Sequence, residues 1–316
     1  MALKLLMLGI VLPAIIALTV EVVAAVGRQR RLLRNAQQRG NAAPGVAAAE
    51  ARVPSGGAVN PTWDVALALG LGYLMAYVTL LRVPRFPFAE VLDRHAMMVM
   101  VATALGVWLN GQSRVHPKAS LVLVALWALL LPFVLLQPMF GGWAPLEAMQ
   151  HVALQAAFLF CAWLLMEPLA QRSPGALLPL CFTLAVAALA FAIERSNTTR
   201  VLQLGVALAA TVSAVTVVAF LSPRLSLARG GLAVLLTVAG GLCIHVQFYA
   251  FSDVPGPVFA LLLLAPLGLW VRQLPALRQA AGWKRDGAGF AAVGLCLVLG
   301  LVWLFQAVPL GREPYF

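Results

Sequence analysis

The chain has 316 residues, of which 62% are apolar and only 10% are charged, and its mean hydropathy is +0.92. Soluble domains contain about 45–50% apolar and about 25% charged residues. The composition therefore excludes an ordinary soluble globule, a disordered chain and a disulfide-stapled secreted module, and it leaves a polytopic membrane protein. The four cysteines lie in apolar runs without a CxxC or Cys/His cluster, so we interpret them as small apolar side chains and predict no metal site.

Ten apolar runs approach the length of about 20 residues that a membrane-spanning helix needs. In chain order they are 3–26, 62–82, 96–111, 119–139, 147–168, 175–194, 201–221, 230–251, 256–273 and 287–308. The third run is the shortest and lies near the lower limit for a span. The run 256–273 contains Pro266, which a membrane helix tolerates with a kink. The sequence predicts a single all-α transmembrane domain, residues 1–316, of about ten helices.

The net charge of +11 is a topological signal, because the basic residues lie between the apolar runs. With the N-terminus outside, 15 of the 22 Lys and Arg residues fall on the cytoplasmic side, which predicts an N-out, C-out orientation. The longest connection, 27–61, is Arg-rich and then Ala/Gly/Pro-rich, and we expect a flexible cytoplasmic loop. Basic and aromatic residues are not interleaved on an amphipathic surface, so no nucleic-acid partner is predicted. The Ala/Leu/Arg-rich composition is typical of a high-GC bacterial genome and favours a bacterial inner membrane.

Ten spans can be divided into two halves of five, and an odd number of spans per repeat gives inverted halves. The second helices of the two halves end alike, with LLRVPRF at 80–86 and AFLSPRL at 219–225. The fourth helices share a Pro-interrupted leucine run, ALLLPFVLLQP at 128–138 and LLLLAPLGLWVRQLP at 261–275. These matches suggest a 5+5 inverted repeat.

A polar stripe marks the fifth span. Glu147, His151 and Gln155 follow i, i+4, i+8 spacing, which places them on one helix face, from the outer end towards the middle. His245 and Gln247 lie at a similar predicted depth on the eighth span. Because polar side chains in a bilayer are costly, we expect these five residues to face the protein interior or a polar vestibule open to the outside.

Three interpretations compete for this cluster. Its members could simply hydrogen-bond between packed helices. They could form a substrate or proton pathway, because a histidine beside a carboxylate exchanges protons near neutral pH. Lastly, His151 and His245 could ligate one b-type haem from opposite sides; apart from this alternative, no cofactor is predicted.

The sequence contains no P-loop, GxSxG, HExxH or GxGxxG motif, so it favours a protein that is not an enzyme. The first functional hypothesis is a small-molecule transporter or permease with an outward-facing polar site. The alternative is a non-catalytic or electron-carrying subunit of a larger complex, in which other membrane subunits join the lipid bilayer as partners. A lipid-modifying enzyme that uses Asp93 and His95 of the predicted outer loop 83–95 is less favoured, because that loop offers only two carboxylates.

Overall fold

A computed structural model describes residues 10–24, 27, 63–84, 86, 88, 90–112, 117–196, 198–223, 225–250, 253–278 and 281–308. Within these residues nine helical segments are long and apolar enough to cross a membrane, and no strand occurs. They are α4 (Trp63–Leu80), α5 (Val91–Gln112), α6 (Pro117–Leu136) with the 3₁₀ turn η2 (Gln137–Met139), α7 (Pro145–Arg172), α8 (Leu177–Glu194), α9 (Thr199–Leu221), α10 (Gly230–Tyr249), α11 (Gly256–Leu264) with the 3₁₀ segment η3 (Ala265–Gln273), and α13 (Gly282–Ala307). The prediction of an all-α polytopic membrane protein is confirmed.

The first predicted span appears as a shorter apolar helix, Leu12–Ala24, because only part of the run 3–26 belongs to the described residues. The predicted loop 27–61 lies outside the described residues, apart from residue 27. The remaining predicted spans each correspond to one helical segment, and a four-residue helix, α12 (Pro275–Arg278), connects η3 to α13.

The third span differs from its prediction, which began at residue 96. Helix α5 starts at Val91 and runs for 22 residues, so Asp93 and His95 lie inside the helix and not in an outer loop. Both side chains are only 1% exposed. A run of 16 residues is short for a bilayer, and the helix reaches a full span by including polar residues that bond to neighbouring helices.

The ninth span contains the break expected at Pro266, but the break is longer than a kink. The α-helical part ends at Leu264, and nine residues of 3₁₀ helix follow. Pro266 lacks the N–H group that an α-helix would need at this position. Gly268 lets η3 approach α13 closely, because a Cβ there would lie 2.7 Å from the backbone nitrogen of Val293.

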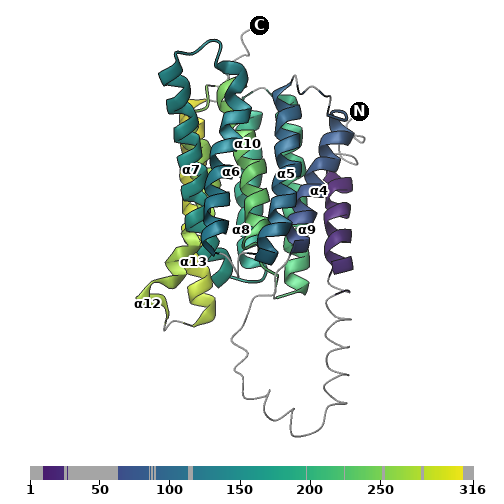
Figure 1. Cartoon of the computed structure of the whole chain (residues 1–316). Coiled ribbons are helices and arrows are strands. Elements are labelled where there is room, and N and C mark those ends of the chain that lie inside the picture. The colour runs from purple at the N-terminus through teal and green to yellow at the C-terminus, as the bar shows by residue number, and fades with distance from the viewer. Residues whose placement is uncertain are drawn as a thin grey trace.

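The helices lie side by side in one bundle (Figure 1). Helix α10 is the most buried of the nine segments and α13 the least. Helix α10 packs against α4, α5, α6, α7, α9 and α11, which makes it the centre of the bundle. The turn between α6 and α7 lies at one end and α12 at the other (Figure 1), as the alternating topology requires.

The central helices α5 and α10 meet at glycines. A Cβ on Gly230 would lie 2.0 Å from the carbonyl oxygen of Gly106, so only glycine permits this crossing. The Asn110 side chain donates to the same Gly106 carbonyl over 3.1 Å. Small residues at such contacts are typical of membrane helices, because close backbone approach replaces the hydrophobic driving force that is absent in lipid.

Candidate functional site

Two polar faces meet where α4 packs on α5. Tyr73 and Tyr77 are one turn apart on α4 and fully buried. They face Asp93 and His95 in the first turns of α5: the Tyr73 hydroxyl lies 3.2 Å from His95 Nδ1, and the Tyr77 hydroxyl donates to Asp93 Oδ1 over 2.5 Å. This pairing buries an ionisable carboxylate and an imidazole near the end of the bundle where α4 ends and α5 begins.

The contacts of His95 select one tautomer of its neutral ring. Its Nε2 lies 3.3 Å from the main-chain oxygen of Thr237, and a carbonyl can only accept a hydrogen bond. Nε2 therefore carries the hydrogen, and Nδ1 is left to accept the hydroxyl hydrogen of Tyr73. Both nitrogens are satisfied in the neutral ring, so burial of His95 leaves no polar atom without a partner.

Asp93 belongs to an ion-pair cluster at the end of the bundle where α4 ends and α5 begins. Arg82 places its Nη2 atom 2.6 Å from Glu90 Oε1 and 3.3 Å from Asp93 Oδ2. Glu90 Oε2 is also 3.9 Å from Arg200 Nη1, near the start of α9. The cluster thus joins the α4–α5 connection to the first turn of α9.

One face of α10 continues this polar zone towards the middle of the bundle. Thr237, Gly241 and His245 are spaced by four residues and share that face. The His95 ring packs on Gly241, where a Cβ would lie 2.3 Å from its Nε2. One helical turn before Gly241, the Trp127 indole donates to the Thr237 hydroxyl over 2.8 Å.

A cavity of about 440 Å³ opens beside His245. It is lined by residues of the α4–α5 connection, α5, α9 and α10: Glu90, Val91, Leu92, Thr198, Thr199, Arg200, Val201 and His245. We call it the outer cavity, because the sequence predicts that this end faces outwards. Its volume lies within the range of about 300–1,000 Å³ that is usual for small-molecule sites.

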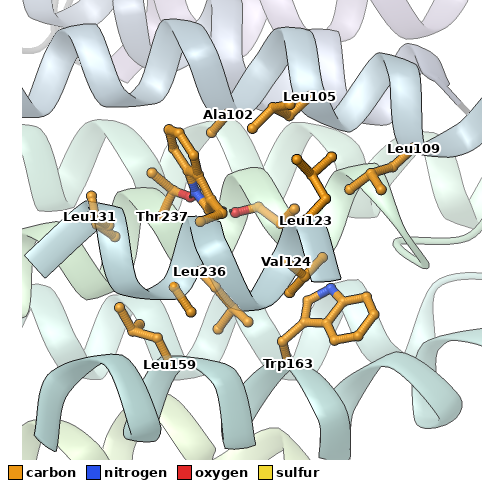
Figure 2. A pocket seen from close by; sticks show the side chains of 13 residues that line it. Ala102, Leu105, Leu109, Leu123, Val124, Leu131, Leu159, Trp163, Leu236 and Thr237 are labelled. Atoms are coloured by element: carbon orange, nitrogen blue, oxygen red, sulfur yellow. Dashed lines mark hydrogen bonds between the residues drawn. The ribbon is translucent and has the colours of Figure 1, made fainter. Parts of the chain in front are cut away.

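A second, smaller cavity of about 30 Å³ lies between α5, α6, α7 and α10. Figure 2 shows its lining, in which leucines from all four helices surround two tryptophans and Thr237. The Trp163 indole nitrogen is buried here and has no hydrogen-bond partner among the described residues. Thr237 is shared by this apolar cavity and the His95 network, so the α10 face connects the two cavities.

The five residues predicted as a polar cluster divide into two groups. Gln155 of α7 donates to Gln247 of α10 over 3.0 Å, and Glu147 lies 3.9 Å from His151 within α7. Glu147 and His151 are 51% and 36% exposed, so this group lies near the bundle surface. His245 instead lines the outer cavity with residues of α5 and α9.

The two histidines considered as haem ligands have different surroundings. The His151 ring packs between Trp143 and Phe248, with centroid distances of 4.8 and 5.2 Å. The His245 ring stacks on Tyr249 at 5.4 Å and borders the outer cavity. Each imidazole is thus engaged by its own aromatic neighbours, and haem ligation by this pair stays a prediction.

The sequence reasoning missed the roles of Tyr73, Tyr77, Arg82 and Thr237, and it placed Asp93 and His95 in a loop. One signal could have found them. The run 96–111 is too short for a comfortable span, so the helix had to extend towards residue 91 and carry its polar residues with it. Which tyrosines would meet them depends on helix pairing.

Comparison with protein families, curated proteins and solved structures finds no match to this chain. The helices nevertheless define its class. Their number, length and apolar composition make it an integral, multi-pass membrane protein whose outer helix faces contact the lipid bilayer.

Proposed function

We propose that this chain is a small-molecule transporter or permease whose substrate enters the outer cavity. The observation that carries the proposal is the buried Asp93–Tyr77 and His95–Tyr73 network, which reaches the cavity wall through the ion pairs of Arg82 with Asp93 and Glu90. Ionisable groups at membrane depth are costly, and they mark substrate or proton pathways when they occur. Glu147, His151, Gln155 and Gln247 extend the proposed pathway along the α7 side.

The packing of the predicted halves supports the same proposal. The second helices of the two halves, α4 and α9, pack on each other, and so do the third helices, α5 and α10. The outer cavity lies among these helices. Transporters built from inverted repeats place substrate sites at the repeat interface.

The broken ninth span is a second supporting feature. Its nine-residue 3₁₀ segment is longer than the three or four residues usual for such helices. The predicted break in the fourth span is wrong: α6 continues as an α-helix through Pro132 to Leu136, and only the terminal turn η2 is 3₁₀. Discontinuous helices form the substrate sites of many transporters, and the broken ninth span supports the proposal on that ground.

Transport can be tested with the purified protein in liposomes on a solid-supported membrane. Currents would be recorded after concentration jumps of small carboxylates, amines, sugars and amino acids. We expect a current for one of these classes and, in Asp93→Asn, a loss on the order of tenfold or more. Glu194→Gln is the matched control, because Glu194 is an exposed carboxylate at the same end of the bundle.

Tyr77→Phe provides a second variant that keeps the carboxylate and removes only its hydroxyl donor. It should lower the current less than Asp93→Asn. The proposal fails if no solute class gives a protein-dependent current, or if Asp93→Asn and Glu147→Gln both leave an observed current unchanged.

The alternative, a subunit of a larger membrane complex, has one supporting observation. Helix α13 packs on α8, α11, α12 and η3 and leaves much of its other surface exposed. We propose a bacterial inner membrane as the location on composition alone. Native mass measurement after purification in a mild detergent separates the two functions, because a stoichiometric second chain would favour the subunit.

A further inference from the structure

The outer cavity has a balanced set of fixed charges. Of its eight lining residues, Glu90, Arg200 and His245 can ionise. Arg82 forms an ion pair with Glu90 of the cavity wall, and Asp93 in turn forms an ion pair with Arg82. Among the described residues of this cluster, two arginines therefore face two carboxylates. The net charge at the cavity is zero when His245 is neutral, and +1 when His245 holds a proton.

His245 differs from His95 in its hydrogen bonds. Both nitrogens of His95 have partners, as described above, whereas His245 Nδ1 is buried without a hydrogen-bond partner among the described residues. The His245 ring also borders the cavity. His245 therefore holds, in the wall of the cavity, hydrogen-bonding capacity that no described residue uses.

Three other titratable groups, on α10 and on the helices packed against it, have other contacts. The Tyr249 hydroxyl donates to the main-chain oxygen of Leu135, and the Tyr73 hydroxyl pairs with His95. On α7, His151 packs on Phe248 and lies near Glu147. His245 is thus the imidazole in the wall of the cavity, and its protonated form donates hydrogen bonds from both ring nitrogens.

We propose that the outer cavity binds a small organic monoanion of the carboxylate class together with one proton held by His245. Binding breaks no bond in the ligand. A proton from water adds to the His245 imidazole, the imidazolium donates a hydrogen bond to a carboxylate oxygen, and Arg200 faces the same negative charge. The first turn of α9, which starts at Thr199 in the cavity wall, adds its partial positive charge. The inference rests on the transporter proposal and names its substrate class and coupled ion.

Binding can be measured on the full chain in lipid nanodiscs, by calorimetry with sodium benzoate and with two analogues, neutral benzamide and cationic benzylamine. We expect benzoate to bind on the order of tenfold more tightly at about pH 5.5 than at about pH 8, and to take up close to one proton. His245→Gln should abolish both the pH dependence and the proton uptake. Arg200→Gln should weaken benzoate on the order of tenfold at either pH.

Two controls match these variants. Arg195→Gln removes a nearby arginine that stacks on Phe191 and Phe305 and does not line the cavity, so it should leave benzoate binding unchanged. His116→Gln removes a histidine between the predicted spans 96–111 and 119–139, on the side predicted to be cytoplasmic, and should keep the pH dependence.

The possible outcomes separate this inference from the transporter proposal. One outcome is that benzamide or benzylamine binds in place of benzoate and that this binding is lost in Arg200→Gln. It would overturn the assignment of an anionic ligand but keep the outer cavity as a substrate site. Benzoate binding that keeps its pH dependence in His245→Gln would overturn the role of His245. If no probe binds and no solute gives a transport current, both proposals are overturned.

Discussion

At the scale of single residues, the buried network is explained by hydrogen-bond satisfaction. A polar atom without a partner in a bilayer costs several kcal/mol, so each buried group must find a donor or acceptor on a neighbouring helix. His95 does so on α4 and on α10, and its ring fits only because Gly241 has no side chain. The glycine is therefore as necessary to the network as the polar residues are.

We expect Gly241→Ala to destabilise the protein. Its Cβ would lie within 2.3–3.1 Å of three His95 ring atoms, and overpacking of this kind costs about 1–3 kcal/mol. Gly294→Ala is the matched control, because Gly294 is also inside a helix but has no atom within 4 Å of its added Cβ. Thermal unfolding in detergent should give a lower midpoint for Gly241→Ala and an equal or higher one for Gly294→Ala. Equal midpoints would contradict the placement of His95 on α10.

A double-mutant cycle can measure the bond between Trp127 and Thr237. Trp127→Phe removes the donor and Thr237→Val removes the acceptor. We expect a coupling free energy of about 0.6 kcal/mol and at most about 1.7 kcal/mol between them, as double-mutant cycles give for side-chain bonds between membrane helices. Denaturant unfolding of the four proteins gives the value, and strictly additive effects would show that this bond contributes nothing to stability.

At the scale of elements, the connection between α9 and α10 is held by α7. The backbone N–H of Arg229, just before α10, donates to Glu167 Oε2 over 2.7 Å, and Gln171 donates to Glu167 Oε1. Ser226 donates its hydroxyl to the carbonyl oxygen of Ala170. These bonds fix the start of the central helix, and they hold Arg229 at a φ of +66°, a conformation that L-residues rarely adopt.

The strain at Arg229 gives a prediction that does not depend on its side chain. Arg229→Gly and Arg229→Ala both remove the guanidinium, but only glycine adopts this backbone conformation without strain. We expect Arg229→Gly to be more stable than Arg229→Ala by about 1 kcal/mol. Chemical unfolding of the two variants measures the difference, and a more stable alanine variant would contradict the positive φ of this residue.

At the scale of the whole molecule, the order of the helices determines which ends meet. The α6–α7 turn and α12 lie at opposite ends of the bundle (Figure 1), and the charge pattern predicts that the α6–α7 turn is outside. The outer cavity, the ion-pair cluster and the α7 polar stripe then share the outer side. The predicted orientation thus decides from which compartment a substrate would enter.

Cysteine labelling tests this orientation in intact cells. After the four native cysteines are replaced, Gly141→Cys in the α6–α7 turn should react with a membrane-impermeant maleimide, since positive charge is retained on the cytoplasmic side. Ala276→Cys in α12, which is also exposed, should react only after the membrane is opened. The reverse pattern would place the outer cavity in the cytoplasm.

The sequence alone determined the class of the protein and most helix positions, because a bilayer requires about 20 apolar residues in each span, a requirement that is local. It also indicated the break at Pro266, since a missing N–H is a property of one residue. Only the tertiary structure decided that α5 begins at Val91, that Tyr73 and Tyr77 satisfy His95 and Asp93, and that His245 faces α9 while Gln247 faces α7. These facts depend on which helices are neighbours and how each is rotated, and in a chain that is apolar on nearly every face the sequence pattern does not specify the rotation.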